Sequence, residues 1–312
     1  MTRDTAAGAP AHQPALPAAP PDARCVRRAR TARIGRWLLV LSIVGSIVVS
    51  IWSMERVPGA AWQPAALGLL PWVVGKYLLC PLRWHSLSVA GQTRRWHLRA
   101  YAESELIGLA SPAHIGADVW RMHRLRATGM TRPCAVAEVG LDRVVGTLGV
   151  AVFVVVSGAT LPLDVLLLAA GIAVALVVAG LVLHRMRPGL LAARPMPRPR
   201  VLVKGILISM GYQLTIMGLV IGSVAAMGQQ VDPLALLGIF GASQLAGAVP
   251  GVHGASPREG ALVVGLASLG VSWTAPRAAV ALAAVLAWLP ALLLGGVCLG
   301  IRRLRPAAPL AA

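Results

Sequence analysis

Six stretches of this sequence are apolar over about the length that an α-helix needs to cross a bilayer, roughly 20 residues. Continuous apolar runs differ from the alternating segments of about ten residues that a transmembrane β-barrel shows. The sequence therefore predicts an all-α polytopic membrane protein. The predicted spans are 34–54, 62–82, 135–157, 163–183, 205–227 and 276–301.

Composition supports this class. The mean hydropathy is +0.72, and 57% of the residues are hydrophobic against 13% charged. The net charge of +18 comes almost entirely from arginine, clustered in short loops beside apolar runs. That is the positive-inside pattern, and it favours binding to anionic lipid headgroups over binding to nucleic acid. The four cysteines show no paired spacing, so neither a disulfide framework nor a zinc site is predicted.

Arginine content also predicts topology. The basic loops 83–99, 121–132 and 184–204 are predicted to be cytoplasmic, together with both chain termini, as in a multi-pass protein of a bacterial inner membrane. Residues 1–33 are predicted to form a disordered basic tail, because they are rich in Ala and Pro and end in arginines. Residues 34–302 form the predicted transmembrane domain, and 303–312 a short C-terminal tail.

Two further apolar regions are too short or too broken to be ordinary spans. Ala100–Val119 lies between two basic loops, so it must start and end on the same side, which predicts a re-entrant helical hairpin. The region 234–271 is either a second hairpin, entering from outside, or two thin spans that raise the total to eight. With two hairpins, the halves 34–157 and 163–302 read as an inverted repeat, an arrangement that places substrate sites near the midplane.

The polar residues of these regions form three groups of candidate site residues. The first is Pro112, Gly116, Asp118 and Arg121, in which the Pro and Gly break the helix and the charged pair shares a helical face. Its alternative is a surface ion pair. The second is Glu138, Asp142 and Arg143 at the base of a predicted span, where unpaired charge is costly; its alternative is a salt bridge that only fixes packing.

The third group lies in the second short region. It comprises the helix-breaking residues Pro250, Gly251 and Gly254 and the charged residues Arg258 and Glu259, with Pro257 expected to open a helix. For Glu259 the alternative is a favourable interaction with the helix dipole. The seven charged residues are predicted to converge on one polar cavity. No metal site and no cofactor are expected: His114 and His253 are a weak metal signal.

At these motifs the chain resembles the lysylphosphatidylglycerol synthase transmembrane-region-like family, which is similar to the flippase part of the bacterial multiple peptide resistance factor. Three runs carry the resemblance: GADVWR, AEVGLDRVVGTLGV and VPGVHGASPREGALVVGLASLGV. Ala117 replaces a second Gly of the first family motif, and His253 and the Ser256–Pro257 pair depart from the third. The resemblance implies a lipid translocase module that lacks the soluble synthase domain.

The predicted function is therefore that of a non-enzymatic, flippase-like transporter for an anionic or headgroup-bearing glycolipid or phospholipid. The alternative is a non-catalytic membrane partner or scaffold subunit of a lipid-modifying or glycosyl-transferring enzyme. A translocase needs the internal charges to face a cavity, whereas a scaffold needs them only paired. The lipid, the direction of movement, the energy source and the oligomeric state do not follow from the sequence.

Overall fold

The computed structural model describes residues 61–109, 111, 114–157, 194–247 and 256–304, together with Val48 and isolated residues between 163 and 186. All of them belong to the second of the two units into which the chain divides, Leu39–Ala312. The predicted tail 1–33 lies outside the described residues. The predicted spans 34–54 and 163–183 are described only at isolated positions.

The described part of the chain is helical and contains no strand, which confirms the all-α prediction. Four helical segments in it are long and apolar enough to cross a membrane, and each falls on a predicted span. Two are unbroken: α6 (Arg132–Ser157) and α9 (Pro199–Ala226). The other two each contain a π-helical turn; they are α2 (Trp62–Val74), η1 (Gly75–Leu79) and α3 (Cys80–Leu87), and then α12 (Thr274–Pro290), η4 (Ala291–Gly295) and α13 (Gly296–Leu304).

Proline lies close to both interruptions. Pro81, in the first turn of α3, cannot donate an N–H to the carbonyl of Tyr77 in η1, and its ring crowds that carbonyl. Pro290 immediately precedes η4. Single π-helical turns are frequent at functional sites, and η1 carries Lys76.

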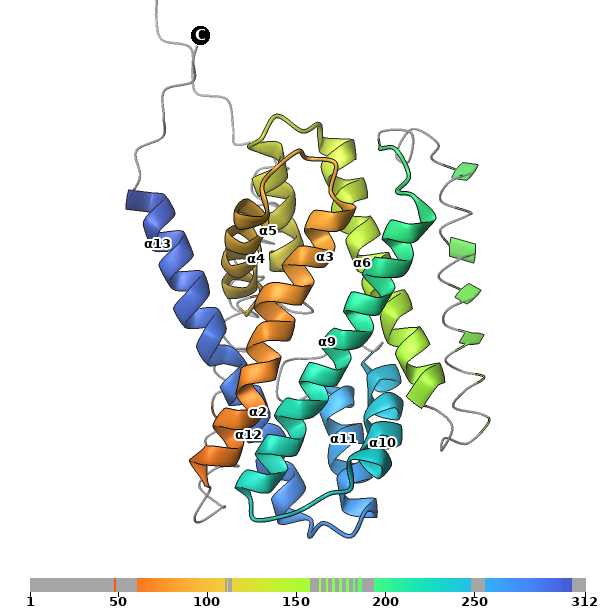
Figure 1. The fold of residues 1–312 in the computed structure, drawn as a ribbon, viewed down its shortest axis with the longest axis vertical. Coiled ribbons are helices and arrows are strands. Elements are labelled where there is room, and N and C mark those ends of the chain that lie inside the picture. The colour runs from red at the N-terminus through yellow and green to blue at the C-terminus, as the bar shows by residue number, and fades with distance from the viewer. Residues whose placement is uncertain are drawn as a thin grey trace, which may run out of the picture. The chain divides into compact units, whose positions relative to one another are not determined.

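Two helical hairpins separate these long segments. The first consists of α4 (Arg94–Leu109) and α5 (Ile115–Arg126), and the second of α10 (Pro233–Ala246) and α11 (Pro257–Ser268). At 1.5 Å per residue their longest helix is about 24 Å, shorter than the hydrocarbon core of about 30 Å. In Figure 1 the first hairpin lies in the upper part of the view and the second in the lower part, so the two lie at opposite ends of the long helices.

Local sequence explains where the second hairpin's helices begin. Asp232 caps α10 by accepting hydrogen bonds from the N–H groups of Leu234 and Ala235, each at 3.2 Å. At α11, Pro257 occupies the first helical position, and Glu259 accepts a 2.7 Å hydrogen bond from the Ser256 N–H to form a capping box. The prediction that Pro257 opens a helix is confirmed.

The predicted loop boundaries are wrong in three places. Helix α3 continues to Leu87 and α4 begins at Arg94, so the connection between them is much shorter than 83–99. Helix α5 extends to Arg126, and α9 begins at Pro199, inside the predicted linker. The physical reason is that arginines such as Arg83 sit within helices, paired with carboxylates, rather than in solvated loops.

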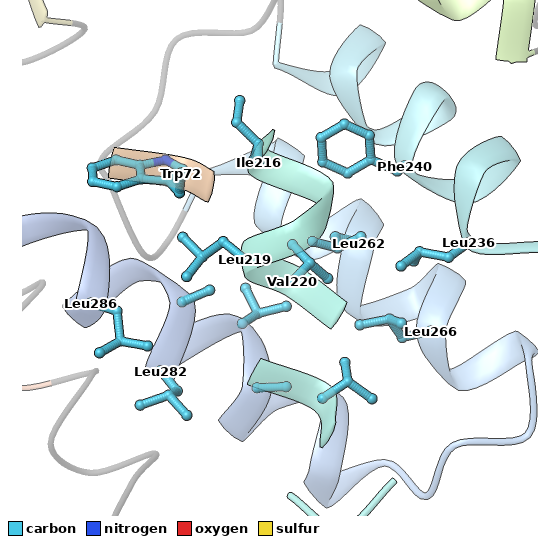
Figure 2. Packing of buried hydrophobic residues seen from close by; sticks show 14 of the residues in the cluster. Trp72, Ile216, Leu219, Val220, Leu236, Phe240, Leu262, Leu266, Leu282 and Leu286 are labelled. Carbon is cyan, nitrogen blue, oxygen red and sulfur yellow. The ribbon is translucent and has the colours of Figure 1, made fainter. Parts of the chain in front are cut away.

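The apolar core gathers around α9, which packs most extensively against α2. Figure 2 shows Leu219 and Val220 of α9 surrounded by side chains from α2, α10, α11 and α12, including Trp72 and Phe240. Close packing of α9 on α2 depends on glycine. A Cβ at Gly222 would lie 2.5 Å from the Pro64 carbonyl oxygen and 2.7 Å from the Gly68 Cα, so the two backbones touch.

Each hairpin packs against a long helix that is distant in sequence. Helix α4 contacts η4 and α13, where a Cβ at Gly295 would lie 2.6 Å from the Ala102 carbonyl oxygen. Helix α10 contacts α6, where the rings of Phe153 and Phe240 meet edge to face with centroids 5.9 Å apart. Both hairpins are therefore held by tertiary contacts with the long helices as well as by their own.

Candidate functional site

Asp142, on α6, lies at the centre of a buried ionic cluster. Its side chain is fully buried and accepts hydrogen bonds from Arg83 Nε at 2.8 Å, Arg83 Nη2 at 3.2 Å and Arg121 Nη1 at 2.8 Å. Arg83 also donates to Ser209 Oγ on α9 at 2.8 Å. One carboxylate thus joins α3, α5 and α6, with α9 attached through Arg83.

Asp118 extends this cluster toward the surface. It accepts from Arg121 Nη2 at 2.6 Å and from Arg143 Nε at 3.0 Å. The side chain of Arg121 is 4% exposed, whereas that of Arg143 is 47% exposed, so the chain of ion pairs runs from the interior to the surface. Arg83, Asp118, Arg121, Asp142 and Arg143 are called the arginine cluster below. Its three arginines and two carboxylates leave a surplus of one positive charge.

Burial and the neighbouring carboxylates shift the pKa of Arg121 in opposite directions. Burial alone would lower the pKa of its guanidinium, because desolvation disfavours the charged form. Asp142 and Asp118 outweigh that effect and raise the pKa above its usual value. Arg121 is therefore a permanent cation inside the protein.

Glu138, one turn before Asp142, makes a separate set of contacts. It is fully buried, accepts hydrogen bonds from the Ser88 hydroxyl and the Val89 N–H, and forms an ion pair of 3.7 Å with Arg194. Arg194 in turn donates to the Leu87 carbonyl. This arrangement ties the end of α3 to α6 and to the segment before α9.

A second ionic group, Lys76, Glu105 and His114, is called the central cluster. Lys76 lies near the middle of the segment Trp62–Leu87, Glu105 lies on α4, and His114 lies at the turn between α4 and α5. Lys76 Nζ is 2.9 Å and His114 Nε2 is 2.8 Å from the same oxygen, Glu105 Oε2. Burial alone would raise the pKa of Glu105, but Lys76 and His114 hold it well below its usual range.

Aromatic rings connect the two clusters. The Tyr101 ring lies between them, with its centroid 5.9 Å from Lys76 Nζ and 5.5 Å from the Arg121 guanidinium carbon. Lys76 is also 5.7 Å from the centroid of Tyr212, near the middle of α9. Cations at these distances interact with the negative faces of the rings. The Tyr101 ring therefore links the two clusters.

The turn of the first hairpin has a fixed geometry. His114 adopts a left-handed backbone conformation with φ 60°, which is uncommon for a residue with a side chain. Gly116 donates its N–H to Ser111 Oγ at 2.8 Å, and a Cβ there would lie 2.6 Å from the same oxygen. Gly116 is thus required by close approach, and it lies in the first turn of α5, just after the break between the two helices. Pro112 lies outside the described residues.

The second hairpin contributes Arg258 and Glu259 from the first turn of α11. Glu259 belongs to the capping box and lies in the first turn of α11, the position that the helix-dipole alternative requires. Arg258 packs against the end of α10, 3.4 Å from where a Gly247 Cβ would be, and its charge acts on Tyr212. Among the described residues Arg258 forms no ion pair. Pro250, Gly251, His253 and Gly254 lie outside the described residues.

Four of the seven charged residues predicted for the site come together in the arginine cluster: Asp118, Arg121, Asp142 and Arg143. Convergence of all seven on one cavity stays a prediction. The sequence prediction missed Arg83, Lys76 and Glu105. Because its neighbours are basic, the sequence places Arg83 in a loop. The position of Glu105, directly before the short apolar part of the hairpin, could have identified it as a buried charge.

The outer face of the first hairpin carries an apolar groove of about 520 Å³. Among its lining residues, Ile115 and Val119 are 60% and 54% exposed, although they share α5 with the buried Arg121. This part of the hairpin therefore exposes apolar side chains, whereas Glu103, Glu105 and Arg121 are buried. The groove is lined by Ile107, Ser111, Ile115, Gly116, Val119, Trp120 and His123.

The described residues define a class: an all-helical protein with four membrane-length apolar helices, two short hairpins and a charged interior. Among these residues no three His, Cys, Asp or Glu side chains gather as a metal site would require. Comparison of the chain with protein-family models, with curated proteins and with solved structures gives no match.

Proposed function

We propose that this protein is a multi-pass lipid translocase of a bacterial inner membrane that moves an anionic, headgroup-bearing lipid, as its resemblance to the synthase transmembrane-region-like family implies. The observation that carries the proposal is the burial of charge in the first hairpin. Glu103, Glu105 and Arg121 are buried, whereas the apolar Ile115 and Val119 are exposed. Such a segment is stable in a membrane only if its polar side lines a protein interior.

The arrangement of the hairpins supports a re-entrant topology. Each hairpin helix is too short to cross the bilayer alone, and the hairpins occupy opposite ends of the long helices (Figure 1). In this proposal the two halves, 34–157 and 163–302, form an inverted repeat of six full spans and two re-entrant hairpins. The turns of both hairpins then meet near the midplane, where inverted-repeat transporters bind their substrates.

An amphipathic substrate matches the chemistry of the site. Arginine forms paired hydrogen bonds with phosphate oxygens, and the arginine cluster has a surplus cation. Arg258, with no ion pair among the described residues, is the proposed contact for the headgroup phosphate. The apolar groove of the first hairpin is proposed to hold an acyl chain. A scaffold would need only paired charges, so it has no evident use for Arg258, which forms no ion pair among the described residues.

The test is lipid movement in reconstituted vesicles. Vesicles containing the purified protein receive fluorescent phosphatidylglycerol, and a membrane-impermeant quencher measures how fast the lipid leaves the outer leaflet. We expect movement to be faster than in protein-free vesicles and Arg258→Gln to slow it by about tenfold, the effect of losing roughly 1.4 kcal/mol of binding.

The control is Arg277→Gln, an exposed arginine whose guanidinium lies 5.6 Å from the Trp273 ring centroid and which belongs to neither cluster. It should leave the rate unchanged. Movement no faster than in protein-free vesicles would reject the translocase. Equal rates for wild type and Arg258→Gln would remove Arg258 from the site.

A further inference from the structure

The open end of the first hairpin carries basic residues from two helices that are far apart in sequence. Helix α5 ends with Arg124 and Arg126, and α13 ends with Arg302 and Arg303. In Figure 1 the end of α13 lies in the upper part of the view, as the first hairpin does. Among the described residues, only Arg124 of these four forms an ion pair, with Glu103. Positive charge therefore accumulates at this end of the hairpin.

Glu103, on α4, organises the contact between the two helices. Its Oε2 accepts a hydrogen bond from Trp120 Nε1 at 3.1 Å and lies 3.2 Å from Arg124 Nε. The guanidinium carbon of Arg302 lies 4.8 Å from the Trp120 ring centroid. Glu103, Trp120, Arg124 and Arg302 are called the α5–α13 junction below. Its two arginines and one carboxylate leave one positive charge in excess.

The two arginines of the junction are close enough to repel each other. Burial lowers the pKa of the Arg124 guanidinium, and the charge of Arg302 also lowers it, against the opposite effect of Glu103. Arginine nevertheless stays charged in proteins. An anion bound beside both guanidinium groups would offset this repulsion.

Arg302 is oriented in a way that suits such an anion. It lies over an indole ring whose own N–H is engaged by Glu103. A guanidinium stacked on a ring uses its flat face and keeps the N–H groups along its edge for another partner. Phosphate oxygens accept paired hydrogen bonds from that edge.

The apolar groove of the first hairpin leads directly to the junction. It extends from Ile115, at the beginning of α5, to Trp120 and His123, and His123 is the residue before Arg124. Trp120 thus belongs to both the groove and the junction. Tryptophan is a residue that favours the headgroup level of a membrane. Apolar surface on one side of Trp120 and excess positive charge on the other match the two ends of an anionic phospholipid.

We propose that the α5–α13 junction and the adjoining groove form a binding site for an anionic phospholipid, with its phosphate on Arg302 and Arg124 and one acyl chain along α5. This inference rests on the proposed function for the membrane placement of the hairpin and for the acyl chain in the groove, but not on lipid movement. Basic pockets between helices at a membrane surface bind anionic headgroups in this way. The bound lipid joins the first hairpin to the last helix.

A lipid explains both parts of the site. A free phosphate or a soluble phosphate ester would engage the junction alone and leave the exposed Val119 without a partner. A neutral lipid would fill the groove but leave the excess charge of the junction uncompensated. An anionic phospholipid does both.

The experiment counts lipids on the purified full-length protein by native mass spectrometry. The protein in detergent is titrated with phosphatidylglycerol or with phosphatidylcholine of the same acyl chains. We expect phosphatidylglycerol to bind about tenfold more tightly, equivalent to about 1.4 kcal/mol. Glycerol 3-phosphate, which has the phosphate but no chain, should not displace it at equal concentration.

Two variants separate the charge from the chain. Arg302→Gln should weaken phosphatidylglycerol binding by about fivefold, or about 1 kcal/mol for one arginine near an anionic headgroup, and affect phosphatidylcholine much less. Val119→Asn places a polar amide in the groove and should weaken both lipids. Either variant suffices if the other fails to fold.

Arg277→Gln is the matched control. Arg277 also lies over a tryptophan ring near the end of a helix, with 5.6 Å between its guanidinium carbon and the Trp273 centroid, but it adjoins neither the groove nor a second arginine of the junction. It should bind phosphatidylglycerol as wild type does. Equal affinity in wild type and Arg302→Gln would overturn the proposal, and so would displacement of the lipid by glycerol 3-phosphate.

The two proposals fail differently. If Arg302→Gln weakens phosphatidylglycerol binding but wild-type protein moves no lipid in vesicles, the site stands and the translocase is wrong. If wild-type protein moves lipid and Arg302→Gln binds phosphatidylglycerol equally well, the translocase stands and this site is wrong.

Discussion

Asp142 is the residue on which the buried charges depend most. It is the common partner of two nearly buried arginines, Arg83 and Arg121. Removing one member of a buried ion pair leaves a charge without compensation, which costs about 3–5 kcal/mol. We therefore expect Asp142→Asn to lower the unfolding temperature of the purified protein in detergent strongly, as measured by intrinsic fluorescence.

Arg143→Gln is the matched control for Asp142→Asn. It also breaks an ion pair of the arginine cluster, but the Arg143 side chain is 47% exposed. Exposed pairs contribute about 0–1 kcal/mol, so its unfolding temperature should stay close to that of wild type. Equal losses in the two variants would contradict the central place of Asp142.

At the scale of the elements, the crossing of α2 and α9 is set by glycine. A methyl group at Gly222 would meet backbone atoms of Pro64 and Gly68, which can move only if the helices separate. We expect Gly222→Ala to destabilise the protein by about 1–3 kcal/mol, the usual cost of overpacking. Equilibrium unfolding in mixed micelles measures the change.

Gly211 on the same helix provides the opposite case. The nearest atom to a Cβ built there is Leu79 Cδ1 at 3.7 Å, an ordinary contact. Gly211→Ala should therefore be neutral, or more stable by up to about 1 kcal/mol through better helix propensity. If Gly211→Ala proves as damaging as Gly222→Ala, close backbone packing is not what the α2–α9 crossing requires.

Elements were easier to predict from the sequence than the contacts between them. Apolar length located four long helices, and the i, i+3 spacing of Asp118 and Arg121 placed both on one helical face, where they form an ion pair. The pairs Arg83–Asp142 and Lys76–Glu105 could not be predicted in this way. They depend on the rotation and depth of one helix against another, which local spacing does not determine.

At the scale of the whole molecule, the re-entrant topology makes a prediction about sidedness. With the native cysteines replaced by serine, single cysteines at Ala127, between α5 and α6, and at Gln229, between α9 and α10, should be labelled from opposite sides of the membrane. An impermeant maleimide applied to intact cells should modify the second and reach the first only after lysis, because the basic loops are predicted to face the cytoplasm.

The position between α11 and α12 extends the same experiment. A cysteine at Gly270 should react like the one at Gln229, because α10 and α11 return to the side from which they entered. Reaction of Gly270→Cys only after lysis would show that the region 234–271 crosses the bilayer an odd number of times. The inverted repeat would then be wrong.

The packing of α4 against η4 and α13 has a consequence for biosynthesis. During translation α4 is complete long before residues 291–304 leave the ribosome. Until then Glu103 and Glu105, both nearly buried in the finished protein, lack the neighbours that shield one side of their helix. We therefore expect the first hairpin to reach its final packing only after the last helix has been made.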